Sequence, residues 1–178
     1  SGQLLRYLAD AHSIEEQALA QLRTAPDIAG EARLAGALGE HLLETQEHER
    51  LVRERMNALG EAPSRLKDMI MAVGGKGFVI LARSQPDTPG KLAAHAYSYE
   101  HLEIAAYELL ARVARSAGDA ETEAMAERIR GDEERMAQRI ADVFDETVRA
   151  SIAGLDAGEL QSRLVSYLAD AHALEQQS

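Results

Sequence analysis

The chain has 178 residues and carries 19 lysines and arginines against 30 aspartates and glutamates, so its formal net charge at pH 7 is −11. It contains no cysteine, which excludes disulfides, thiolate metal ligands and cysteine nucleophiles. The negative charge argues against binding to nucleic acid or to an anionic membrane, because proteins bind both through lysine and arginine side chains. It favours the attraction of cations.

Apolar residues recur with the 3.6-residue period of an amphipathic helix along nearly the whole chain, and signals for strands are almost absent. This periodicity predicts helices at about 3–24, 28–59, 65–83, 90–117, 119–150 and 157–178. Pro26-Asp27, Gly60 and Gly118 mark breaks between them. We therefore predict an all-α protein, a four-helix bundle with a short connecting helix at 65–83 and an extra C-terminal helix.

An internal repeat distinguishes the last of these helices. The hexapeptide Tyr-Leu-Ala-Asp-Ala-His occurs at 7–12 and again at 167–172, and the match continues on both sides. We interpret residues 1–154 as one bundle domain and residues 155–178 as an extra helix that repeats the first and starts a second tandem copy. A long helix that merely resembles the first is the alternative. If the second copy is absent, the apolar face of the helix at 157–178 needs a groove on the same bundle or on a neighbouring chain. We therefore expect a homo-oligomer, most simply a dimer.

Each of the four long helices carries a carboxylate near the middle of its inward, apolar stripe. The four residues are Glu15, Glu44, Glu100 and Glu133. An unpaired buried carboxylate costs several kcal/mol, and like charges that converge raise one another's pKa. Arginines would neutralise such residues singly, whereas divalent cations would neutralise all of them at once. Inward Glu and His side chains on facing helices are also the template for dinuclear carboxylate sites in bundles.

Two histidines lie on the same helix face as Glu44. His41 precedes it by three residues and His48 follows it by four, and we expect either of them to complete the metal shell. Tyr107 is expected to pack in the core, and His12 is expected to be structural. Carboxylates with a few imidazoles suit iron or manganese better than Cu(I) or structural zinc, so we predict two Fe ions, with Mn as the alternative.

Three motifs carry a resemblance to a known family. They are Asp10-Ala11-His12 leading into Glu15-Glu16-Gln17, then His41-Leu42-Leu43-Glu44-Thr45, and finally the most specific, Glu100-His101-Leu102-Glu103-Ile104-Ala105-Ala106-Tyr107. Over about residues 4–150 the chain resembles the YciF-like (YciE/YciF) family of bacterial ferritin-like stress proteins. The resemblance implies a ferritin-like bundle with a dinuclear iron or manganese centre, and a role in handling metal or oxidants under stress.

The chain departs from the general ferritin-like pattern because it contains no Glu-x-x-His motif. The expected site is therefore rich in carboxylates and poor in histidine, with Glu103 as an extra ligand. In this interpretation Glu44 and Glu133 bridge or chelate the two metals, and Glu15 and Glu100 bind them terminally.

The predicted function is that of a ferroxidase-type or peroxide-handling protein, whose partners are metal ions and O₂ or peroxide. Two alternatives stay open. One is a non-catalytic helical scaffold with a degenerate ferritin-like site, which the repeat favours, and the other is a metal-storage protein that holds more than two ions per unit. We expect a cytoplasmic location, because the sequence has no cysteine and no visible targeting or membrane-spanning segment.

Overall fold

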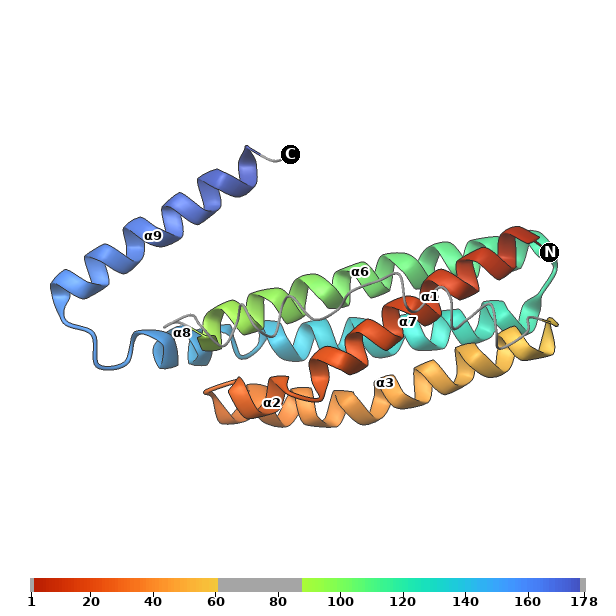
Figure 1. The fold of residues 1–178 in the computed structure, drawn as a ribbon, viewed down its shortest axis with the longest axis horizontal. Coiled ribbons are helices and arrows are strands. Elements are labelled where there is room, and N and C mark those ends of the chain that lie inside the picture. Colours follow the sequence, from red (N-terminus) through yellow and green to blue (C-terminus); the bar gives the residue numbers. More distant parts are fainter. Residues whose placement is uncertain (1, 61–87, 177–178) are drawn as a thin grey trace.

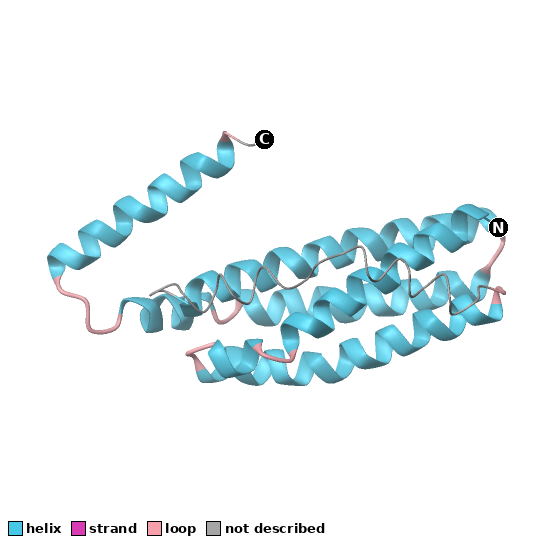
Figure 2. Ribbon diagram, in the orientation of Figure 1, coloured by secondary structure: helices cyan, strands magenta, loops and turns pink. Residues whose placement is uncertain are grey.

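The computed structural model describes residues 2–60 and 88–176, and all regular secondary structure in these ranges is helical (Figure 1, Figure 2). The helices in this part of the chain are α1 (Gly2–Leu22), α2 (Ala25–Ile28), α3 (Ala32–Ala58), α6 (Thr88–Ala117), α7 (Ala120–Ala141), α8 (Phe144–Ile152) and α9 (Ala157–Glu175). The prediction of an all-α helical bundle is confirmed, and the predicted helix at 65–83 lies outside the described residues. Among the described helices, none is long and apolar enough to cross a membrane.

The bundle consists of α1, α3, α6 and α7, which run side by side along the length of the molecule (Figure 1). Its apolar core is divided into two clusters. One contains Leu38 of α3 and Met136 of α7, and the other contains Val52 of α3 and Ile129 of α7. On each of the four helices a buried histidine or glutamate lies in sequence between the residues of the two clusters. The helices therefore place a polar layer at the centre of the bundle.

The connection from α1 to α3 is more ordered than the predicted break at Pro26-Asp27. Pro26 lies in the first turn of α2, where its missing N–H costs no helical hydrogen bond, and Ala25 packs into the core. α3 then begins at Ala32, because the carboxylate of Glu31 accepts hydrogen bonds from the N–H groups of Arg33 and Leu34 at 2.9 and 2.7 Å.

The single helix predicted at 119–150 is wrong, because the structure divides it into α7 and α8. No glycine or proline marks this break in the sequence. Val143, at the break, is 3% exposed and packs into the apolar core, and Ser151 of α8 accepts a hydrogen bond from the N–H of Gly90 at 2.9 Å. Packing against α6, rather than a local breaker residue, accompanies the break between the two helices.

α9 lies outside the four-helix bundle (Figure 1) and meets the start of α6, where Asp170 Oδ2 is 3.5 Å from Lys91 Nζ. On its apolar face Leu164 and Leu168 are 55% and 62% exposed, whereas their counterparts in the repeat, Leu4 and Leu8, are 4% and 0% exposed in α1. The repeated sequence is thus buried in one copy and exposed in the other. The division after residue 154 and the second tandem copy stay predictions.

Candidate metal centre

Titratable side chains from all four long helices meet in the polar layer. They are Glu15 of α1, His41 and His48 of α3, Glu100 and Glu103 of α6, and Glu133 of α7, and none is more than 3% exposed. His41 and His48 face the interior together because seven residues span about two helical turns. Glu100 and Glu103 share one face of α6 because residues three apart are neighbours on a helix.

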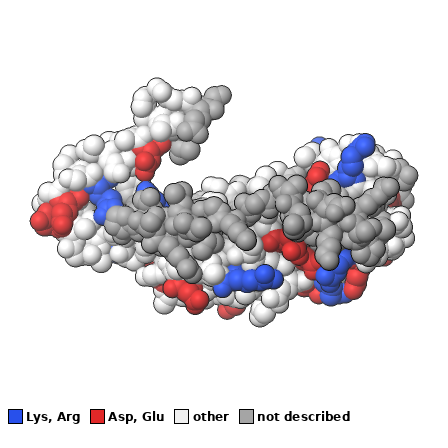
Figure 3. Space-filling view, in the orientation of Figure 1, with Lys and Arg blue, Asp and Glu red and all other residues white. Residues whose placement is uncertain are grey.

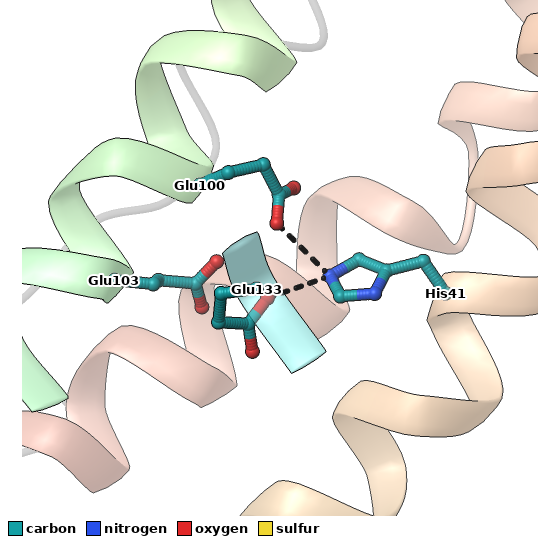
Figure 4. A group of neighbouring side chains, drawn as sticks. All are labelled: His41, Glu100, Glu103 and Glu133. Atoms are coloured by element: carbon teal, nitrogen blue, oxygen red, sulfur yellow. Dashed lines mark ion pairs between the residues drawn. The ribbon is translucent and has the colours of Figure 1, made fainter. Parts of the chain in front are cut away.

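A first group of possible ligands consists of His41, Glu100, Glu103 and Glu133. Each offers one ligand atom, and these atoms all lie within 4.8 Å of one another. His41 Nε2 lies 3.3 Å from Glu100 Oε2 and 3.2 Å from Glu133 Oε2, and Figure 4 shows the three glutamates pointing toward the region in front of this imidazole. The group comes from three different helices, so only the folded bundle assembles it.

A second group, next to the first, consists of Glu15, His48 and Glu133, again with ligand atoms within 4.8 Å of one another. His48 Nδ1 lies 2.9 Å from Glu133 Oε1 and 4.0 Å from Glu15 Oε1. Glu133 belongs to both groups, with Oε2 toward His41 and Oε1 toward His48. One carboxylate with an oxygen facing each of two ligand groups is the arrangement that a metal-bridging carboxylate requires.

Several buried atoms that face this layer make no hydrogen bond of acceptable geometry, although His41 and His48 form ion pairs with Glu100 and Glu133 at 2.9–3.3 Å. They include Glu15 Oε2, His41 Nε2, His48 Nδ1, Glu100 Oε2 and both carboxylate oxygens of Glu103 and of Glu133. Each buried polar atom left unpaired costs about 1–3 kcal/mol, so native proteins rarely leave several of them together. A pair of hard divalent cations would satisfy them, and a donor set of carboxylates with two imidazoles fits iron or manganese.

Glu44 does not lie where the sequence analysis placed it. Its side chain is 44% exposed, and its Oε2 lies 2.9 Å from Nδ1 of His41. The expectation that Glu44 faces inward is therefore wrong, and this position does not support its expected role as a bridge between the metals. The inward face of α3 is occupied by His41, Thr45 and His48, and Glu44, on the flank of this stripe, points outward.

The two histidines of this layer, His41 and His48, each contact a carboxylate through the ring nitrogen that faces away from the other residues of the layer. Glu44 lies against Nδ1 of His41, and Asp132 Oδ2 lies 3.2 Å from Nε2 of His48. Such carboxylates fix the tautomer and the orientation of a metal-binding imidazole. They direct Nε2 of His41 and Nδ1 of His48 toward the glutamates, so each histidine presents one ring nitrogen to a group that could hold a metal ion.

Burial and mutual repulsion strongly perturb the acid–base equilibria of this layer. Burial raises the pKa of the Glu15 carboxyl to about 8 and that of Glu100 to about 7. Burial opposes ionisation of Glu133 as well, but the imidazoles of His41 and His48 lower its pKa to about 2. Burial likewise opposes protonation of His41, and the facing carboxylates outweigh this and raise its pKa well above the usual range. Without metal, the layer therefore keeps protons on Glu15, Glu100 and His41. Bound cations would take the place of these protons as the neutralising positive charge.

Arginine side chains do not neutralise these glutamates in the described part of the chain. The five arginines available from the sequence, Arg6, Arg50, Arg112, Arg130 and Arg135, have other carboxylates or Gln3 as partners. In Figure 3 the lysine and arginine side chains lie at the surface, close to aspartates and glutamates. Among the described residues, the two histidines are therefore the basic side chains that contact these inward carboxylates.

Tyr107 is a member of this layer that the sequence analysis left in the core. It is completely buried, and its hydroxyl donates a hydrogen bond to Oε1 of Glu15. Its position seven residues after Glu100, on the same stripe of α6, was the available signal. His12 is buried, with Nε2 at 2.9 Å from Oε1 of Glu49, and with Glu16 and Glu49 it forms a third group whose ligand atoms lie within 4.8 Å of one another, so its structural role stays a prediction.

The fold and the site together define the class of this protein: it is an all-α helical bundle with a buried layer of glutamates and histidines that could hold metal ions. The sequence profile of the family described as "Domain of unknown function (DUF892)" matches residues 3–153, and the chain belongs to this family. No curated protein matches the sequence significantly.

Solved structures agree with this assignment. A protein from Xanthomonas campestris pv. campestris is 26% identical, with a TM-score of 0.68 over 85% of this chain and 94% of that one. The Escherichia coli stress protein YciF is 22% identical, with a TM-score of 0.68 over 83% of this chain and 96% of that one. The resemblance to YciF-like proteins is confirmed, and at this identity the likeness to YciF concerns the fold.

Proposed function

We propose that this chain is a ferritin-like dinuclear metal protein that binds two iron ions, with manganese as the alternative. One ion is held by His41, Glu100, Glu103 and Glu133, and the other by Glu15, His48 and Glu133. The single observation that carries the proposal is the position of Glu133, whose two oxygens face the two groups separately, one paired with His41 and the other with His48. Glu44, which the sequence analysis assigned as a bridge, becomes the partner that orients His41.

The proposed redox chemistry rests on the metal ligands and the protons that the buried side chains would hold. Glu15, His41, His48, Glu100, Glu103 and Glu133 would hold the two Fe(II) ions, which when bound would supply the electrons for reducing O₂ or peroxide, as in ferroxidase-type sites. Burial has raised the pKa of Glu15 to about 8 and that of Glu100 to about 7, so both carboxyl groups hold protons near neutral pH. Each would release its proton when a cation binds. Tyr107 orients Glu15 through its hydroxyl, and the two apolar clusters exclude water from both sides of the layer.

The test is an anaerobic titration with Fe(II) of Glu133→Gln, beside the wild type and a matched control. Glu134→Gln removes the same charge from the next residue of α7, where the side chain is 54% exposed. We expect about two ions per chain for the wild type and for Glu134→Gln, and loss of saturable binding at both positions for Glu133→Gln. Unchanged binding by Glu133→Gln would overturn the proposed site, and uptake far above two ions would favour storage.

Exposed apolar residues on α9 favour assembly as a second role. We propose that this helix mediates self-association of the chain, with a dimer as the simplest product. The support is that Leu160, Leu164, Val165 and Leu168 are between 40% and 62% exposed, although an apolar face of this size is normally covered. Association in solution is independent of the metal centre and is measured separately.

A further inference from the structure

A small cavity adjoins the proposed metal centre at the end of the bundle that carries α2. It has a volume of about 30 Å³ and lies among α1, α2, α3 and α6, whose arrangement is visible in Figure 1. Its lining includes Glu100, which is 3% exposed and belongs to the His41 group. Gln21 and His95 are half-buried and line it as well, and Nε2 of His95 lies 2.9 Å from Oε1 of Gln21. The cavity thus connects a partly exposed rim with a proposed ligand.

The wall between these polar residues is apolar. It is formed mainly by alanine and leucine side chains, among them Ala18, Leu22, Leu38, Leu92 and Ala96. Tyr99 also lines it, but its hydroxyl donates a hydrogen bond to the carbonyl of Ile14 at 3.0 Å and so contributes mainly the ring. α2, which the sequence analysis did not predict, completes the wall with Ala25 and Ile28.

The size and the lining of the cavity decide which molecules suit it. About 10–15 Å³ of such volume accommodates one water, so a diatomic molecule fits in about 30 Å³. A buried water needs about two to four polar partners, and a hydrated cation or a peroxide also loses hydrogen bonds on entering an apolar wall. An apolar diatomic molecule loses none.

We propose that this cavity binds dioxygen and delivers it to the metal centre beside Glu100. The inference rests on the proposed function for the destination of the molecule, whereas the binding of a small apolar molecule rests on the cavity alone. It also selects dioxygen over peroxide as the oxidant that uses this route.

Xenon tests the binding step without any metal, because it is a small apolar probe of such cavities. In the metal-free full chain under xenon pressure, the methyl resonances of Leu22, Leu38 and Leu92 are expected to shift. Ala96→Val fills the cavity from α6 and is expected to abolish these shifts, and Ala25→Val does the same from α2, should the first variant fold poorly. Ala114→Val is the matched control, because it adds the same methyl groups to α6 in the other apolar cluster.

The delivery step is measured by mixing the Fe(II)-loaded protein with O₂. Ala96→Val is expected to bind Fe(II) as the wild type does but to oxidise it about tenfold more slowly, equivalent to about 1.4 kcal/mol on the barrier. Ala114→Val should match the wild type. Absence of xenon shifts in the wild type, or an unchanged oxidation rate in Ala96→Val, would overturn the proposal. If the wild type bound no Fe(II), the metal centre would be refuted, and the xenon shifts would still decide whether the cavity binds an apolar molecule.

Discussion

Replacement of Glu103 by methionine distinguishes two effects of a buried carboxyl group: the loss of stability that it causes in the metal-free protein, and its contribution to metal binding. Glu103 is 1% exposed, neither carboxylate oxygen has a hydrogen-bond partner, and burial together with the charges of Glu133, Glu15 and Glu100 raises its pKa well above the usual value. Methionine has a similar length and no polar oxygen. We therefore expect Glu103→Met to raise the free energy of unfolding of the metal-free protein by about 1–3 kcal/mol.

The expected change in thermal stability is measurable. For a chain of this size about 1 kcal/mol corresponds to a rise in Tm of roughly 2–4 °C, so calorimetry with chelator present should show an increase of about 2–12 °C. A surface control, Glu134→Met, should change stability by less than about 0.5 kcal/mol.

Added metal should reverse the order. At a free ion concentration of about 1,000 times the wild-type Kd, binding stabilises the wild type by about 4.1 kcal/mol, which exceeds the advantage of about 1–3 kcal/mol of Glu103→Met when loss of this ligand abolishes binding. A lower Tm for metal-free Glu103→Met than for the wild type would refute the reasoning, because it would mean that the carboxyl group stabilises the bundle without a cation.

Three further outcomes are expected. The folded pKa values of Glu15 and Glu100, about 8 and about 7, are raised, so the folded metal-free protein binds more protons than the unfolded chain, and these groups make it less stable as the pH rises from about 4.5 to about 8. For the same reason Mn(II) affinity should increase over this range with release of protons, which calorimetry in buffers of different ionisation enthalpy detects, and a pH-independent affinity would contradict it. Glu44→Gln should weaken metal binding by about 10–100-fold without changing the number of ions, since it alters only the partner of His41, and an unchanged Kd would remove Glu44 from the site. Leu164→Ser combined with Leu168→Ser should lower the molar mass measured by light scattering if α9 mediates association, and an unchanged mass would show that another surface does.

The inward stripes were the most predictable part of the site. Glu15, Glu100 and Glu133 each lie three or four residues from buried apolar neighbours on their own helix, and this spacing is enough to place them in the interior. His41 and His48 were predicted on the same face for the same reason. Glu44 was placed wrongly because it lies at the edge of the α3 stripe, where a small rotation of the helix decides between the interior and solvent.

The structure of the helix ends was less predictable. Glu31 and Pro26 carry local signals that explain the ends of α2 and α3 once they are known. The break between α7 and α8 has no such signal, because it depends on contacts of Val143 and Ser151 with residues distant in the sequence.

The sequence by itself determined that the protein is a helical bundle whose long helices bring carboxylates and two histidines into the interior. Helical periodicity is a local property, so a single helix is enough to reveal it. Only the tertiary structure decided that Glu133 faces His41 with one oxygen and His48 with the other, that Glu44 lies outside, and that a small apolar cavity adjoins Glu100. These features depend on the rotation and separation of four packed helices, which are set by how their side chains interlock rather than by spacing along any one of them.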